Sequence, residues 1–307
     1  MKTKRTAPSR PAHRSGQTQS PRSPVAGASP VVLITGCSSG IGNALARCFH
    51  DAGFQVVATA RCLDALQPLA VQGMDTDVLD VTNTYEIRQV VERVLAEKGR
   101  IDVLVNNAGY GLMAPTLDVA PAELRSQFHT NVFAPLELVQ AVAPAMREAG
   151  RGLIINIGSV SGVVTTPFAG VYCASKAALH ALSDALRMEL APFGIRVMTV
   201  QPGAIRSSFG DKAQAKAAQV LRTDSWYQTL ADAVLARANL SQINSTPVEV
   251  FAQQLVRAAQ RPSPPPVLRL GKSSRFLPLL KWILPTGWCD RLFIQKFGLT
   301  RLSRRSG

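Results

Sequence analysis

Short apolar runs alternate along the chain with longer stretches in which apolar residues recur every three or four positions. The clearest run is Val-Val-Leu-Ile at 31–34, which ends at Gly36. A continuous β-branched run of this length is typical of a parallel strand buried on both faces. The pattern predicts strands at 31–34, 55–59, 75–80, 101–105, 153–157, 195–200 and 266–270.

Helical periodicity fills most of the intervals between these strands. The predicted helices lie at 41–52, 63–70, 83–98, 121–148, 171–192 and 248–260. Strands that alternate with helices predict an α/β fold, a parallel sheet covered by helices on both faces. No repeat of solenoid period is present.

Three segments lie outside this alternation. The stretch 204–247 follows a strand end and contains Trp226, so we predict a substrate lid there. Residues 261–266 are rich in proline and break any helix. We therefore divide the chain into a leader at 1–29, a catalytic domain at 30–260, and an extension at 261–307 with the last strand and a helical, amphipathic end.

Composition narrows the class of protein. The chain has 307 residues, of which 46% are hydrophobic and 18% charged, as expected for a globular protein with a sizeable core. No apolar run approaches the roughly 18 residues that span a bilayer. The five cysteines show no paired spacing, which predicts reduced thiols in an intracellular protein.

The net charge of +14 is concentrated at the two ends of the chain. Residues 1–29 carry +6 and residues 261–307 carry +9, whereas 30–260 carries −1. The predicted domain thus lacks a basic stripe, and we expect no nucleic-acid partner. The Pro-, Ser- and Arg-rich leader has no apolar signal region and is predicted to be disordered.

A glycine-rich turn directly follows the first strand and opens the first helix, with the spacing Gly-x-x-x-Gly-x-Gly over 36–42. Glycines let the backbone approach a pyrophosphate, and the helix N-terminus offers free N–H groups. This predicts a dinucleotide site, although a βα turn without ligand is the alternative. The residues assigned to it are Thr35, Gly36, Ser38, Ser39, Gly40, Ile41 and Gly42.

The end of the second strand indicates which dinucleotide is preferred. A carboxylate there would bind the ribose hydroxyls, but Arg61 occupies the position and can pair with a 2′-phosphate. We therefore expect NADP(H) rather than NAD(H), unless Arg61 is a solvated loop cation. Asp80 ends the third strand, where it can bind the adenine amino group or cap the next helix with Thr82.

Four residues form a candidate catalytic set. Tyr172 and Lys176 lie four positions apart and share a helix face, so the ammonium is expected to lower the pKa of the phenol. Ser159 follows a strand end and can polarise a substrate oxygen, while Asn131 can hold a proton-relaying water. The alternatives are a helix cap for Ser159, a packed aromatic for Tyr172 and a backbone brace for Asn131.

Taken together, these motifs resemble the short-chain dehydrogenase/reductase family over about 30–260, closest to its hydroxysteroid and retinol dehydrogenase branch. The resemblance implies a Rossmann-type sheet of order 3-2-1-4-5-6-7, a Ser-Tyr-Lys triad extended by Asn131, and cofactor contacts from Tyr172 and Lys176. The further residues that carry it and are implied to contact the cofactor are Asn107, Ala108, Gly109, Pro202, Gly203 and Ile205.

This resemblance implies an NADP(H)-dependent oxidoreductase that interconverts a carbonyl and an alcohol on an apolar substrate: a steroid, a retinoid or a long-chain compound. The alternatives are a 3-oxoacyl thioester reductase and a non-catalytic dinucleotide-binding regulator. The candidate substrate residues are Met113, Phe168, Phe209 and Trp226. No metal is expected.

We expect a cytoplasmic homodimer. The basic, apolar C-terminal extension has two interpretations that stay open here. It contacts the inner face of a membrane, or it packs on the domain or on a second copy.

Overall fold

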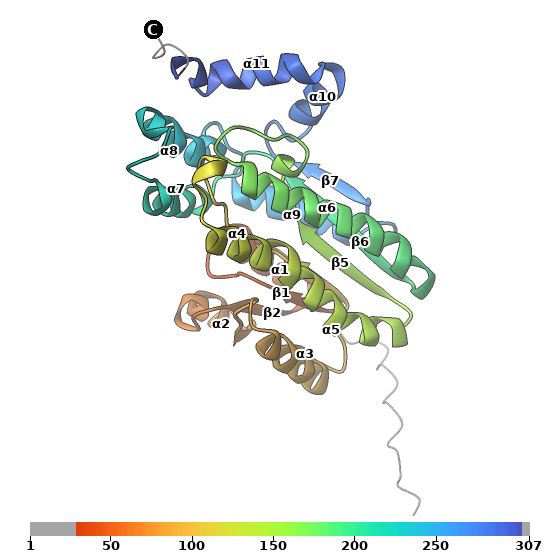
Figure 1. The fold of residues 1–307 in the computed structure, drawn as a ribbon. Coiled ribbons are helices and arrows are strands. Elements are labelled where there is room, and N and C mark those ends of the chain that lie inside the picture. Colours follow the sequence, from red (N-terminus) through yellow and green to blue (C-terminus); the bar gives the residue numbers. More distant parts are fainter. Residues whose placement is uncertain (1–28, 303–307) are drawn as a thin grey trace, which may run out of the picture.

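The centre of the structure is a parallel sheet of seven strands in the order β3-β2-β1-β4-β5-β6-β7 (Figure 1). This computed structural model describes residues 29–302, and the order confirms the prediction. The leader at 1–29 lies outside the described residues except for Ser29. The strands are β1 (Val31–Ile34), β2 (Gln55–Ala60), β3 (Asp75–Val78), β4 (Val103–Asn106), β5 (Gly152–Ile157), β6 (Ile195–Pro202) and β7 (Val267–Leu270).

Helices cover both faces of this sheet, as predicted (Figure 1). Their bounds are α1 (Gly40–Asp51), α2 (Gln67–Ala70), α3 (Thr84–Lys98), α4 (Pro121–Phe128), α5 (Ala134–Glu148), α6 (Gly170–Leu190), α7 (Phe209–Val220), α8 (Ala231–Asn239), α9 (Val248–Ala259), α10 (Phe276–Ile283) and α11 (Thr286–Lys296).

The strand β1 shows why the apolar runs are continuous. Val32 and Ile34 pack on one face with residues of α1 and α9, whereas Val31 and Leu33 pack on the other with residues of α3 and α5. Successive side chains of a strand point to opposite faces, so a strand covered on both sides needs apolar residues at every position.

Two elements differ from the expected pattern. The helix predicted at 121–148 is interrupted by a π-helical turn at His129–Phe133, which joins α4 to α5. The edge strand β3 is only partly buried and contains Asp75 and Asp77, so its apolar signal is weak. Single π turns inside helices are frequently found at functional sites.

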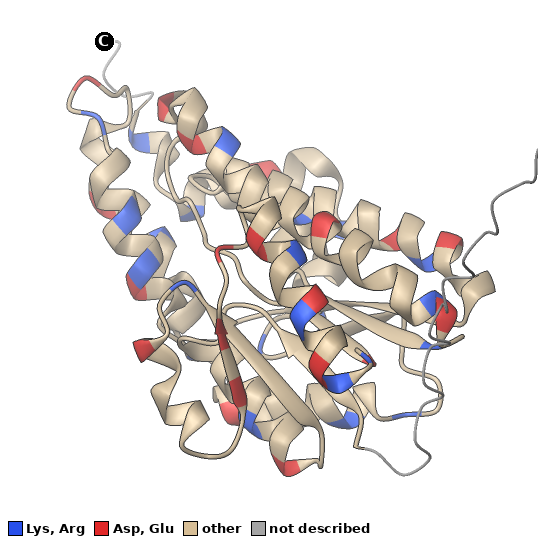
Figure 2. Ribbon diagram, turned by 90° about the horizontal axis from the view of Figure 1, so that it is seen from below, with Lys and Arg blue, Asp and Glu red and all other residues tan. Residues whose placement is uncertain are grey.

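The segment 204–247 and the C-terminal extension share a third apolar core. Leu230 and Val234 from the segment around α8 cluster with Phe293 and Phe297 of the extension. Among the described residues, no helix is long and apolar enough to cross a bilayer. Figure 2 shows acidic and basic residues intermixed over the folded body.

Candidate active site

One cavity of about 990 Å³ lies at the carboxyl ends of the strands. Its lining includes residues that follow five different strands: Gly36, Arg61, Asp80, Asn107 and Ser159. Ligands of open parallel sheets bind at this edge. The sequence placed its candidate cofactor residues at the same edge, and the fold brings most of them into one space.

The glycine-rich turn is closely packed. Gly36 and Gly40 have φ values of +74° and +59°, which side-chain-bearing residues rarely adopt. A Cβ on Gly42 would lie 2.4 Å from the carbonyl oxygen of Gly36. The turn therefore requires glycine at these positions, and its residues Gly36, Ser38, Ser39, Gly40 and Ile41 line the cavity.

Thr35 and Gly42 do not line the cavity, although they were assigned to the cofactor. Thr35 instead ties two strand ends together: its Oγ1 accepts hydrogen bonds from the backbone N–H groups of Asn107 and Ala108 at 3.1 and 3.0 Å. The side-chain amide of Asn107 also donates a hydrogen bond to the backbone carbonyl oxygen of Thr35, at 2.8 Å. These bonds fix the glycine-rich turn against the segment after β4.

At the far end, Arg61 and Asp80 line the cavity together. Asp80 Oδ1 accepts hydrogen bonds from the N–H and hydroxyl of Thr82 at 2.9 and 2.7 Å, as the capping alternative expects. Burial acts to raise the pKa of the Asp80 carboxyl, but the bonds from Thr82 and the charge of Arg61 outweigh it and lower the pKa.

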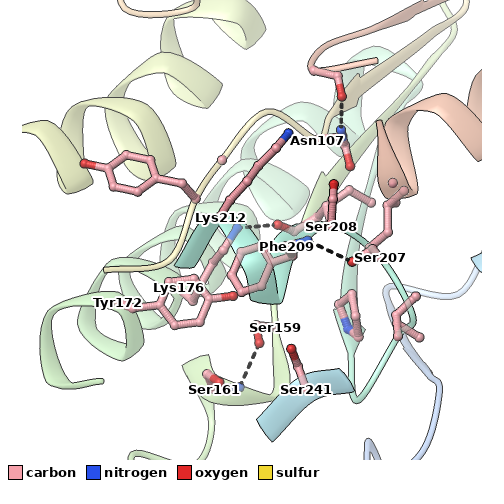
Figure 3. Close-up of a pocket in the computed structure, with 18 of the residues that line it drawn as sticks. Asn107, Ser159, Ser161, Tyr172, Lys176, Ser207, Ser208, Phe209, Lys212 and Ser241 are labelled. Carbon is pink, nitrogen blue, oxygen red and sulfur yellow. Dashed lines mark hydrogen bonds between the residues drawn. The ribbon is translucent and has the colours of Figure 1, made fainter. Parts of the chain in front are cut away.

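Tyr172 and Ser159 converge in the middle of the cavity. Tyr172 lies on α6 and Ser159 follows β5, and the tyrosine hydroxyl points toward the serine (Figure 3). Ser159 Oγ accepts a hydrogen bond from the N–H of Ser161 at 3.1 Å, so this serine does cap the turn it begins. The cap leaves its own O–H free to donate into the cavity.

The pKa of Tyr172 departs from expectation. Burial raises the pKa of the phenol to about 12, while the hydrogen bond with Ser159 and the charge of Arg237 offset this only in part. The expected lowering of the phenol pKa is therefore wrong for this arrangement, because burial is the largest effect on that pKa. At neutral pH the phenol is protonated and suited to donate a proton.

Lys176 is held one turn further along α6. Its Nζ donates a hydrogen bond to the carbonyl oxygen of Ile157 at 2.7 Å, and burial lowers its pKa to about 8. The ammonium lines the cavity next to the end of β5. Its lowered pKa makes proton release and uptake easy near neutral pH.

Asn131 does not line the cavity but braces it from behind. It sits in the π turn, its Oδ1 accepts from the N–H of Tyr110 at 3.2 Å, and its Nδ2 donates to the Tyr110 carbonyl and to Ser175 Oγ, each at 3.1 Å. A Cβ on Gly109 would lie 3.0 Å from Asn131 Oδ1 and 3.7 Å from Lys176 Nζ. These hydrogen bonds agree with the alternative interpretation of Asn131 as a brace for the backbone.

The structure adds His180, which the sequence interpretation missed. Its Nε2 accepts a hydrogen bond from the backbone N–H of Ser159 at 3.3 Å. Burial and the charge of Lys176 lower its pKa to about 4, so the ring is neutral and able to accept. His180 follows Lys176 by four residues and Tyr172 by eight, a spacing on one helix face that could have revealed it.

The start of α7 closes over the glycine-rich turn, which was also not foreseen. Ser208 Oγ and Lys212 Nζ both donate to Ser39 Oγ, at 3.0 and 2.9 Å. Figure 3 labels Ser208 and Lys212 among the residues that line the cavity. Lys212 thus places a cation beside the N-terminus of α1. Pro202, Gly203 and Ile205 line the cavity below this contact, as expected.

The four candidate substrate residues divide into two pairs. Met113 and Phe209 line the cavity, and the Phe209 ring lies 5.7 Å from that of Tyr172. Phe168 does not: it packs edge-on against Tyr227 and Phe297, at 6.0 and 6.3 Å, inside the third core. Trp226 is 80% exposed and lies outside the cavity, so both assignments are corrected.

The family profile described as short chain dehydrogenase matches residues 30–218. The chain belongs to this family. It is 42% identical to a 3-ketodihydrosphingosine reductase of Bacteroides thetaiotaomicron over 59% of its own length and 66% of the relative, just under two thirds.

Two other similarities extend over more of both chains. The human 17-beta-hydroxysteroid dehydrogenase type 1 is 38% identical over 84% of this chain and 82% of its own. A serine dehydrogenase solved in a closed form with NADP+ superposes with a TM-score of 0.69 at 27% identity, covering 80% of this chain and 96% of the other. The fold and the cavity are thus those of an oxidoreductase family.

Proposed function

We propose that this protein is an NADP(H)-dependent oxidoreductase that reduces a carbonyl, or oxidises the matching alcohol, on an apolar substrate. The convergence of the Tyr172 hydroxyl and Ser159 in the cavity that begins at the glycine-rich turn carries this proposal. NADPH, when bound, supplies the hydride. The other steps, which donate and return the proton, are carried out by side chains of the protein.

The cavity fits the cofactor. The backbone of the glycine-rich turn and the N-terminus of α1 would hold the pyrophosphate. Gly42 lies so close to Gly36 that no side chain fits between them, as expected for a tight turn that binds phosphate through its backbone. Arg61 would hold the 2′-phosphate, which supports NADP(H). Lys176 would hold the nicotinamide ribose, and Ile205 would lie near the carboxamide. The serine dehydrogenase, solved with NADP+, supports the same choice.

In the reductive direction, Tyr172 gives its proton to the carbonyl oxygen while Ser159 donates a hydrogen bond to the same atom. The raised pKa of the phenol keeps that proton in place until negative charge develops. Lys176, with its pKa of about 8, returns a proton toward Tyr172. Asn131 supports this relay by fixing the backbone of Tyr110 and the hydroxyl of Ser175.

The apolar walls support a lipophilic substrate. Met113, Val164, Phe209 and Leu277 line the cavity near Tyr172. The two relatives described above are named for a sphingoid ketone and a hydroxysteroid. A 3-oxoacyl thioester would also fit such walls and remains the second candidate.

The test is NADPH oxidation across panels of steroid, retinoid, long-chain keto and 3-oxoacyl thioester substrates, with Tyr172→Phe alongside. We expect the variant to lose at least about 10²-fold in kcat, the size of a positioned acid, while it still binds NADPH. Turnover by Tyr172→Phe at the rate of the unmodified chain would remove the proposed acid. NADPH binding without turnover of any carbonyl would favour a regulatory protein.

We also propose that α10 and α11 contact an anionic membrane surface. Lys281 Nζ donates to the Val163 carbonyl at 2.7 Å, and Phe293 and Phe297 are buried, so the extension is fastened to the domain. Its outer side is nevertheless apolar. The exposed large apolar residues there are Phe276, Leu279, Trp282, Ile283, Trp288, Leu292 and Ile294.

The charges around this surface favour lipid over a second copy. Residues 271–302 contain six Lys or Arg and one acid, Asp290. A symmetric dimer contact through this face would bring two basic sets together, whereas anionic headgroups would neutralise them. Tryptophans with basic neighbours are typical of interfacial helices.

Flotation with vesicles tests this contact. We expect binding to phosphatidylglycerol-containing vesicles that weakens with salt, and a loss of most of it in Trp282→Ser/Trp288→Ser. Trp226→Ser is the matched control, since Trp226 is 80% exposed but lies outside this surface. Unchanged flotation in the double variant, or a change in its oligomeric state without lipid, would contradict the membrane contact and favour a homodimer.

A further inference from the structure

Arg237 is a buried cation in the substrate end of the cavity. It lies on α8, its side chain is 7% exposed, and it lines the cavity together with Tyr172, Val164 and Leu277. Its positive charge acts to lower the pKa of the Tyr172 phenol. Nothing in the acid/base scheme above uses this residue.

The guanidinium has little to neutralise it. Within residues 29–302, its one hydrogen bond is from Nε to Thr166 Oγ1 at 2.8 Å, and no carboxylate lies within 4 Å of it. A guanidinium has five N–H donors, so most of them are unused. Burial lowers the pKa of Arg237, the direction expected for a charge without a counter-ion.

The two acidic residues that line the cavity already interact with other residues. Glu123 pairs with Lys216 at 2.9 Å, and Asp80 is bonded to Thr82 at the opposite end. Neither is available to Arg237. A buried charge without a partner is costly, and a chain bears this cost where a ligand completes the pair.

We infer that Arg237 binds an anionic group, a carboxylate or a phosphate, of the substrate. The guanidinium presents paired N–H donors that match either group. The hydrogen bond to Thr166 fixes the orientation of the guanidinium. The apolar walls of the cavity would contact the rest of the substrate. The substrate class is therefore an anionic amphiphile whose charged group enters the same cavity as the carbonyl that faces Tyr172.

This inference rests on the proposed function only in taking the cavity as the substrate site. It separates the two substrate candidates, because a 3-oxoacyl thioester carries no anion next to its ketone. It also limits the neutral steroids and retinoids to weaker ligands, since they would leave the buried guanidinium without an anionic partner.

Calorimetric titration of the NADPH-loaded protein tests this without turnover. The probes are dodecanoate, dodecyl phosphate and dodecanol, which share one chain and differ in the head group. We expect the better anion to bind at least about tenfold more tightly than the alcohol, the effect of one charge-assisted hydrogen bond. Comparing the two anions shows whether the site takes a carboxylate or a phosphate.

Substitutions assign the preference to the residue. Arg237→Gln is expected to abolish the difference between anion and alcohol, and Arg237→Lys to retain part of it. Arg257→Gln is the control, since Arg257 is exposed on α9 and does not line the cavity. Equal binding of dodecanol and both anions by the unmodified chain overturns the inference even if Arg237→Gln fails to fold.

Failure of this inference differs from failure of the proposed function. A protein that reduces neutral ketones with NADPH but ignores both anions contradicts the role of Arg237 alone. A protein that binds the anions through Arg237 but reduces no carbonyl contradicts the proposed function and leaves the anion site standing.

Discussion

The backbone N–H of Ser159 donates a hydrogen bond to Nε2 of His180 across 3.3 Å. The ring also packs tightly against the same turn, since a Cβ on Gly158 would lie 2.2 Å from Nε2 and a Cβ on Gly162 2.5 Å from Cε1. His180 therefore sets where Ser159 stands relative to Tyr172, without touching the substrate itself. It is a positioning residue.

Replacing His180 should affect the chemical step more than binding. We expect His180→Ala to lower kcat about tenfold or more, since a small misplacement of a hydrogen-bond donor is costly, while the KM for NADPH stays within about twofold. His180→Gln should recover part of kcat, because its amide oxygen can accept the same bond. An unchanged kcat in His180→Ala would show that Ser159 is held by other contacts.

The same histidine should make stability depend on pH. Its folded pKa of about 4 lies below its ordinary value of 6.5, so its contribution is present above pH 6.5 and is lost as the pH falls through 4. Urea unfolding between pH 7 and pH 4 should therefore show a smaller loss of stability in His180→Gln than in the unmodified chain. His50→Gln, at the end of α1, is the control. Parallel curves for His180→Gln and the unmodified chain would contradict the burial of a neutral ring.

Arg61 should discriminate between the two dinucleotides. A charge-assisted contact to the 2′-phosphate would be lost in Arg61→Ala, so NADPH affinity should fall about tenfold and NADH affinity should hardly change. Arg88→Ala, an exposed substitution on α3, serves as the control. Tighter binding of NADH than NADPH by the unmodified chain would show that Arg61 is a solvated cation.

Lys212 should weaken both dinucleotides alike. Its contact with Ser39 Oγ places the ammonium beside the glycine-rich turn, where the pyrophosphate shared by NADH and NADPH is expected. Lys212→Ala should raise both dissociation constants by several-fold, up to about tenfold. A change for NADPH alone would place Lys212 at the 2′-phosphate and not at the pyrophosphate.

The fold was largely readable from the sequence because its signals are local. The run at 31–34 is apolar at every position because β1 is covered on both faces, and the glycine-rich turn follows it directly. Tyr172 and Lys176 share a face of α6 by their spacing alone. In each case the signal itself lies within a few neighbouring residues, so it can be read before the distant partners are known.

Other features were decided only by the tertiary structure. Phe168 and Trp226 look alike as apolar substrate-site candidates, yet Phe168 is buried in a core with Phe297 and Trp226 faces solvent. The pKa of Tyr172 rises because surrounding segments exclude water, which no spacing within α6 reveals. Arg237 became a candidate only once the fold had buried it without an acid, because burial and missing partners depend on residues far away in the chain.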